Sequence, residues 1–162
     1  MADIFIRYET TTGMEKTAKF DTDETKINLD LRDISSIDLL PLVWCDKLEH
    51  LSLRNNRLTH ISLTPLSKCR NLTCLALSNN KLEEIDFSPL TSCKKLEELF
   101  LKGNNLTRVD ISPLFQCSNL QVFEIDESVS MTANMLLRTI GNWPSVLVQQ
   151  YGKILWKVPR RS

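Results

Sequence analysis

Residues 48–71 read LEHLSLRNNRLTHISLTPLSKCRN, and nearly the same text returns at residues 72–95 (LTCLALSNNKLEEIDFSPLTSCKK) and at 96–119 (LEELFLKGNNLTRVDISPLFQCSN). The 24-residue register extends outward on both sides without an insertion. One apolar column holds Ile27, Leu51, Leu75, Leu99 and Phe123, and a second holds Leu29, Leu53, Leu77, Leu101 and Ile125. A fixed period of this length is typical of a solenoid, in which each repeat buries its apolar face against the next.

Each repeat divides into two halves with different local structure. In the first half apolar and polar residues alternate, as in HLSLR at 50–54, which predicts one short parallel strand with one buried face. The second half carries the pairs Leu40-Pro41, Thr64-Pro65, Ser88-Pro89 and Ser112-Pro113. Proline suits the first turn of a helix and a hydroxyl can cap it, so we expect a short helix or 3₁₀ segment here.

The motif LxxLxLxxNxL is present without change in LEHLSLRNNRL, LTCLALSNNKL and LEELFLKGNNL. With these motifs the chain resembles the leucine-rich-repeat family over residues 26–130, with an imperfect first copy (INLDLRDI) and a decaying last one (LQVFEIDESV). The second half of the repeat also resembles short stand-alone archaeal repeat proteins. The resemblance implies an α/β fold, a right-handed solenoid with about five parallel strands on a concave face and short helical or 3₁₀ segments on the convex side.

The resemblance also implies a role for an asparagine column. Asn56, Asn80 and Asn104 occupy the family's asparagine position, where the side-chain amide hydrogen-bonds backbone groups at the turn that leaves the strand. At the two ends this column reads Arg32 and Ser128, so the ladder is expected to stop there.

The two flanks are expected to cap the solenoid, so that residues 1–162 form a single domain. Residues 1–25 alternate on both sides of TTGM, which predicts a β-hairpin that pairs with the first repeat strand. In residues 131–162, TANMLLRTIGN predicts a helix capped by Thr132, and a second helical turn begins at Pro144. Trp143, Tyr151 and Trp156 are expected to seal the last repeat.

Composition excludes several classes of function. Lysine plus arginine equal aspartate plus glutamate at 20 each, so no basic field draws in nucleic acid. No basic, apolar leader opens the chain and no run approaches the ~18 apolar residues of a membrane span, which favours a cytoplasmic protein. Phosphate-binding glycine loops are missing from the sequence, and no cofactor is expected. Four of the five cysteines lie one repeat apart, which indicates reduced, buried thiols: Cys45, Cys69, Cys93 and Cys117.

Function is expected on the concave face, where the residues between the strand leucines point outward and the copies stop agreeing. The candidate partner-binding residues are Asp30, His50, Ser52, Arg54, Ala76, Ser78, Glu98, Phe100, Lys102, Glu124 and Asp126. An outward aromatic ring among charges has the composition of a binding hot spot, although a lone exposed Phe100 can also carry no function. Arg54 and Lys102 either contact a partner or form ordinary ion pairs with Asp30 and Asp126.

A catalytic alternative is weaker. His50, Cys74 and Glu98 are neighbours in one outward column, which suggests a thiol nucleophile or a three-ligand metal site. On an open sheet they lack a pocket and an oxyanion donor, so we expect neither catalysis nor a metal.

The sequence therefore predicts a non-catalytic module that binds an unidentified protein. Five strands span only about 20 Å, so a partner must also touch a flank, a cap or a second copy of the chain. The family resemblance allows a regulator or adaptor of a small GTPase or phosphatase as an alternative. A third reading is an anionic-surface binder that uses the basic residues of the C-terminal segment, which otherwise form a solvated cap: Arg138, Lys153, Lys157, Arg160 and Arg161.

Overall fold

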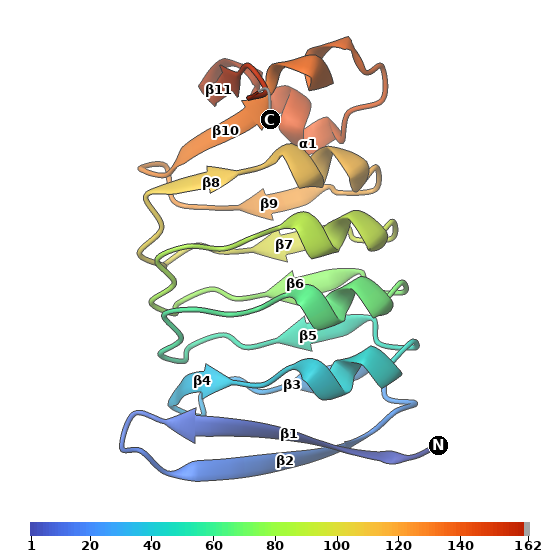
Figure 1. Cartoon of the computed structure of the whole chain (residues 1–162), viewed down its shortest axis with the longest axis vertical. Helices are drawn as coiled ribbons and strands as arrows, with labels where there is room; N and C mark the ends of the chain where they lie inside the picture. The colour runs from blue at the N-terminus through green and yellow to red at the C-terminus, as the bar shows by residue number, and fades with distance from the viewer. Residues whose placement is uncertain (161–162) are drawn as a thin grey trace.

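The computed structural model describes residues 1–160 and is a stack of layers, each one repeat thick (Figure 1). Five three-residue strands form one parallel sheet in the order β3-β5-β6-β7-β9. Their bounds are β3 Lys26–Asn28, β5 His50–Ser52, β6 Cys74–Ala76, β7 Glu98–Phe100 and β9 Val122–Glu124. Every pair is in register at 24 residues, for example Leu51 with Leu75. The predicted solenoid and its five parallel strands are confirmed.

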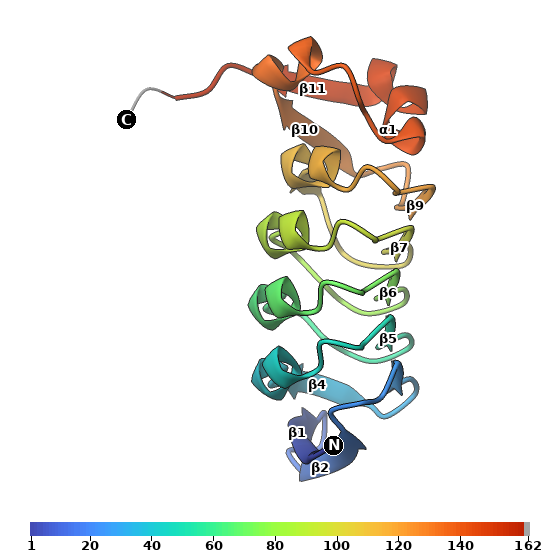
Figure 2. The same ribbon diagram turned by 90° about the vertical axis from the view of Figure 1, so that its right-hand side faces the viewer.

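On the opposite side of the stack lies a row of 3₁₀ helices (Figure 2). They are η1 Leu40–Trp44, η2 Thr64–Lys68, η3 Ser88–Ser92 and η4 Ser112–Gln116, each with its proline in the first turn. The predicted hydroxyl caps are wrong, because the N-cap residue is apolar and makes no side-chain cap bond. In η3 and η4 the carboxylates of Asp86 and Asp110 instead accept the backbone N–H two residues on, both at 2.9 Å.

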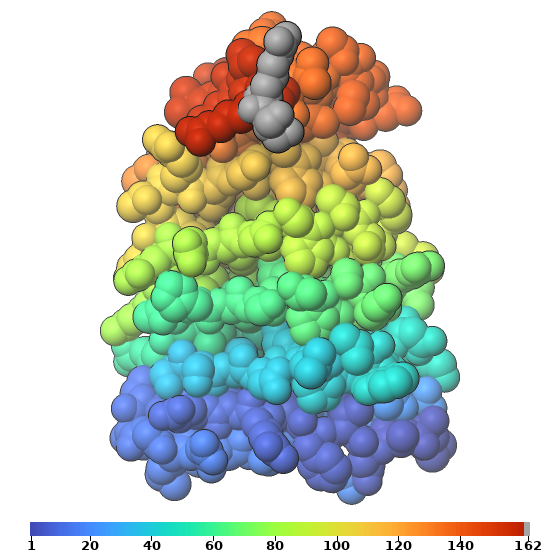
Figure 3. Space-filling model, in the orientation of Figure 1, coloured from blue at the N-terminus to red at the C-terminus, as the bar shows by residue number. Residues whose placement is uncertain are grey.

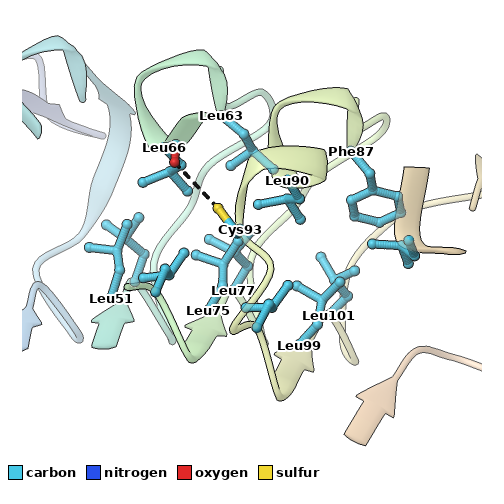
Figure 4. Packing of buried hydrophobic residues seen from close by; sticks show 14 of the residues in the cluster. Leu51, Leu63, Leu66, Leu75, Leu77, Phe87, Leu90, Cys93, Leu99 and Leu101 are labelled. Atoms are coloured by element: carbon cyan, nitrogen blue, oxygen red, sulfur yellow. Dashed lines mark hydrogen bonds between the residues drawn. The ribbon is translucent and has the colours of Figure 1, made fainter. Parts of the chain in front are cut away.

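Leucine columns from both halves of each repeat meet in one continuous core (Figure 4). The ladder cysteines are buried free thiols in this core. Three of them, Cys69, Cys93 and Cys117, bond back to the preceding 3₁₀ helix, as when Cys93 Sγ donates to the Leu66 carbonyl oxygen at 3.3 Å. Burial raises the pKa of Cys69 and Cys117 to about 12. The thiols therefore stay protonated and act as small apolar groups with one weak donor.

The asparagine column fills the turn after each strand with side-chain hydrogen bonds. Asn80 Oδ1 accepts the Leu58 N–H at 3.1 Å, and its Nδ2 donates to the carbonyl oxygens of Leu53 at 2.9 Å and Leu77 at 3.1 Å. Asn56 and Asn104 make the same set of contacts one repeat before and after. Consecutive repeats are thus tied together by side-chain amides, of which those of Asn56 and Asn80 are buried, and this fixes the spacing of the repeats.

The N-terminal cap is a hairpin, but it pairs with a different strand than predicted. β1 (Asp3–Thr10) and β2 (Glu15–Asp21) are antiparallel, and the inward side chains of β1 close the end of the core. β1 pairs antiparallel with β4 (Ile34–Ile37), in the second half of the first repeat, and not with β3. The hairpin therefore leaves the edge of β3 uncovered and covers the core from the convex side.

The C-terminal cap is mixed and not simply helical. β8 (Arg108–Asp110), β10 (Ser130–Asn134) and β11 (Ile154–Lys157) form a parallel sheet, so Thr132 lies in a strand and caps no helix. Three short helical segments lie between β10 and β11: η5 (Met135–Thr139), capped by Asn134, α1 (Ser145–Gln149), which begins after Pro144, and η6 (Tyr151–Lys153). No helix in residues 1–160 is both long and apolar enough to span a membrane.

An aromatic cluster joins this cap to the last repeat, as the sequence predicted. The Trp143 ring lies 5.1 Å from Phe115 of η4, 5.7 Å from Tyr151 and 5.4 Å from Trp156, measured between ring centroids. The space-filling view shows repeats and caps as one closely packed stack (Figure 3).

Candidate functional site

The concave face carries a hollow over the ends of strands β5, β6, β7 and β9. Six predicted residues line it, together with two that the sequence reasoning missed. The lining consists of Arg54, Ser78, Asn79, Phe100, Lys102, Gly103, Glu124 and Asp126. The parallel register brings these side chains together from four consecutive repeats, because equivalent positions lie side by side on adjacent strands.

At the centre of this hollow, a cation lies over an aromatic ring. The Arg54 guanidinium carbon is 4.7 Å from the centroid of the Phe100 ring. Arg54 follows β5 and Phe100 ends β7, so the contact passes over β6. Ala76, which pairs with Phe100 on β6, is only 1% exposed. The small side chain of Ala76 thus leaves room for Arg54 to reach the Phe100 ring. Phe100 is therefore only partly exposed and is in contact with Arg54.

The charged residues of the face do not form the ion pairs that the sequence allowed. The carboxylate of Asp30 accepts the Ser52 hydroxyl at 2.6 Å and the Arg54 backbone N–H at 2.8 Å. Asp126 accepts the Gly103 N–H at 3.0 Å. Within the described chain, neither Arg54 nor Lys102 lies in a salt bridge. Asp30 and Asp126 thus stabilise the backbone turns, and Arg54 and Lys102 have no carboxylate partner within the described residues.

His50, Cys74 and Glu98 lie side by side as predicted, but outside the hollow. Burial, and then the negative charge of Glu98, raises the pKa of the Cys74 thiol, whereas Arg54 lowers it. A protonated thiol is the opposite of what a nucleophile requires. Among residues 1–160 no three His, Cys, Asp or Glu side chains are placed to hold a metal ion.

The two missed residues share a backbone conformation. Asn79 has φ +57° and Gly103 has φ +82°, and both occupy the column immediately before the ladder asparagines. Asn55 in the same column also has φ +57°. Asparagine and glycine tolerate this left-handed region. The dipeptides Asn-Asn and Gly-Asn at this point of each repeat could therefore have predicted the turn. The turn lifts these residues to the rim of the hollow.

The basic residues of the C-terminal segment are spread over different environments. The Arg138 guanidinium lies 5.7 Å from the Tyr151 ring centroid and 5.9 Å from that of Trp156. Lys153 lines a second hollow together with Glu124, Asp126 and Glu127. Arg161 lies outside the described residues.

Residues 46–106 match the family model described as leucine rich repeat. The chain is a leucine-rich-repeat protein. Among solved structures, internalin C2 from Listeria monocytogenes is 37% identical, with a TM-score of 0.47 over 55% of this chain and 37% of that one. A structure of the BIR3–SERK2 complex from Arabidopsis thaliana is 26% identical, with a TM-score of 0.56 over 76% of this chain and 61% of that one.

The leucine-rich-repeat ectodomain of the receptor kinase SOBIR1, also from Arabidopsis thaliana, is 19% identical, with a TM-score of 0.56 over 87% of this chain and 74% of that one. This leucine-rich-repeat protein spans little more than a third of the internalin's length. No curated protein matches it. The leucine-rich-repeat fold commonly serves protein–protein interaction and is generally without enzymatic activity, which agrees with the class of function predicted from the sequence.

Proposed function

We propose that this leucine-rich-repeat protein is a non-catalytic module that binds a protein partner through its concave face, with the Arg54–Phe100 pair at the centre of the contact. The observation that supports this is the cation held at 4.7 Å over the ring. Stacking restrains a long side chain before any partner arrives, so less conformational entropy is lost on binding. Arginine and aromatic residues are also the residue types most enriched at binding hot spots.

The rest of the hollow gives the contact its chemistry. The guanidinium has no carboxylate partner within the described residues, so its N–H donors can bind a carboxylate or carbonyl oxygen of the partner. Lys102 adds a second cation, and Glu124 and Asp126 add acceptors at the other rim. A partner that fits therefore presents an acidic side chain beside an apolar one. Among the structural relatives, the BIR3–SERK2 structure is itself a protein–protein complex.

The test is a comparison of proteins captured from a lysate of the source cells, followed by titration calorimetry with the purified partner. The wild type is compared with a double variant, Arg54→Glu plus Phe100→Ala. We expect the capture to be lost, and binding of the purified partner to weaken by ~2 kcal/mol or more. Arg108→Glu plus Leu136→Ala is the matched control, because both residues are exposed and lie away from the hollow.

The melting temperatures of the two double variants must both stay close to that of the wild type. A well-folded concave variant that captures the same proteins with the same affinity contradicts the proposal. Loss of binding in the control variant alone places the contact on the C-terminal side instead.

A further inference from the structure

The first repeat departs from the later ones on its convex side. The 3₁₀ helices begin with Leu40, Thr64, Ser88 and Ser112, and they end with Trp44, Lys68, Ser92 and Gln116. Three repeats thus place polar residues at these two outward positions, and the first places leucine and tryptophan there. The later copies act as an internal reference, because they show that the fold itself does not require apolar side chains at either position.

These apolar side chains are exposed and do not complete the core. Trp44 is 71% exposed and Leu40 is 61% exposed. Phe5, on the outward side of β1, is 52% exposed. One hollow is lined by all three together with Val43 and the charged residues Asp3, Arg7 and Asp38. We call this surface, made of Phe5, Leu40, Val43 and Trp44, the convex apolar patch.

The size of the patch is that of an interaction surface. With ~150–250 Å² for each large side chain, the exposed parts of Trp44, Phe5 and Leu40 add up to roughly 400 Å². Contiguous apolar patches of this size on a soluble protein commonly mark a binding site. It is about half of the ~800 Å² that each partner buries in a standard interface, so the charged rim must supply the remainder.

The charges around the patch fit a second copy of the same chain. A two-fold interface presents the same surface from both sides, so its rim must carry both signs to be self-complementary. Arg7 forms no salt bridge within the described residues, and the Asp38 carboxylate accepts only the Leu40 backbone N–H, at 2.9 Å. Both groups are available at the same hollow. The formal net charge of zero also leaves no overall repulsion between copies.

We propose that the convex apolar patch is the interface of a two-fold homodimer, in which Trp44 of each copy enters the hollow beside Phe5 of the other and Arg7 faces Asp38 across the axis. The dimer leaves the concave face free on both copies, because η1, which carries Leu40, Val43 and Trp44, lies on the side of the stack opposite β5, β6 and β7 (Figure 2). Because the patch is smaller than a standard interface, we expect a weak, transient dimer with a dissociation constant on the order of micromolar.

The experiment is sedimentation velocity on the full chain from about 5 to about 500 μM. We expect the wild type to pass from monomer to dimer across this range and Trp44→Lys to stay monomeric throughout. Leu136→Lys is the matched control, because Leu136 is 63% exposed in the C-terminal cap and lies outside the patch. It should dimerise as the wild type does.

A charge reversal tests the predicted pairing directly. Arg7→Glu should weaken dimerisation about tenfold or more, and adding Asp38→Lys in the same chain should restore it, because both contacts are then formed with opposite signs. A wild type that remains monomeric at about 500 μM overturns the proposal. A dimer that survives Trp44→Lys, or that only Leu136→Lys disrupts, overturns it as well. Thermal melts of all variants identify any that do not fold.

Discussion

Leu31 lies in a backbone conformation that leucine tolerates poorly, and replacing it should stabilise the protein. Its φ is +57°, the value found for Asn55 and Asn79 in the same column of the next two repeats. Leucine has no polar group that could hydrogen-bond the local backbone in this conformation. A non-glycine residue in the left-handed region costs ~1 kcal/mol or more. Asparagine offsets part of that cost through local hydrogen bonds.

The structure allows the magnitude to be worked out for Leu31→Asn. Leu31 is 78% exposed, so its removal forfeits little buried apolar area. Asn79 Nδ2 donates to Asn55 Oδ1 at 3.1 Å, and an amide at position 31 would extend that ladder by one step. We expect a gain of ~1 kcal/mol in the free energy of unfolding, which for a chain of this size raises the melting temperature by about 2–4 °C.

Urea unfolding followed by circular dichroism gives the measurement. The midpoint should rise with an unchanged slope, since the surface exposed on unfolding stays the same. The reciprocal change, Asn55→Leu, is the control and should lower the midpoint by a similar amount. If Leu31→Asn leaves the midpoint unchanged and Asn55→Leu is harmless, the left-handed turn carries no cost and the reasoning is refuted.

Three further changes probe the interior. Leu77→Ala opens a cavity at a fully buried position in the central repeat and should cost ~2–5 kcal/mol in urea unfolding, so an unaffected midpoint would contradict the register of the repeats. Asn80→Ala removes an acceptor and two donor bonds and should cost ~1–3 kcal/mol, whereas Asn105→Ala, exposed beside the ladder, should cost far less. The pKa of Cys69, raised to about 12 from 9.0, means that the unfolded chain loses this proton first, so stability is full below pH 9 and falls as the pH rises toward 12. Urea midpoints from pH 8 to 10.5 under reducing conditions should show this fall, and Cys69→Ala should make it shallower; a flat profile would show that the thiols ionise equally in both states.

The repeat itself could be predicted from sequence because every column imposes the same packing demand. Strands, 3₁₀ helices and the buried cysteines all follow from periodic positions that must fit their own copies above and below. The ends lack that redundancy. Thr132 looks like a helix cap in isolation, but its hydroxyl bonds the Val109 carbonyl oxygen at 3.3 Å because β10 continues the second sheet beside β8. The hairpin was recognised by its alternation, yet both β3 and β4 offered an edge, and alternation does not distinguish between them.

The candidate site was predicted to the level of a face but not of a contact. Outward columns follow from strand alternation, which identified Arg54, Phe100 and Lys102 as neighbours. The stacking of Arg54 across β6 depends on a rotamer choice and on the size of Ala76, which the column pattern does not reveal. Ion pairs of Arg54 and Lys102 with the acids were one of the two alternatives, whereas Asp30 and Asp126 accept backbone N–H groups from the turns of neighbouring repeats. Backbone donors at these turns recur in every repeat, so they compete with a mobile cation for the same carboxylate.

Ala76 connects the repeat architecture to the proposed function. The other members of its column are Asn28, Ser52, Phe100 and Glu124, all larger, and at 1% exposure it has no free surface to offer a partner. A larger residue at position 76 would occupy the space over which Arg54 reaches Phe100, and it would do so without touching the core beneath. Variation on the concave face therefore has two physical roles in this chain: some positions supply contact groups, and Ala76 sets the distance across which two of those groups can meet.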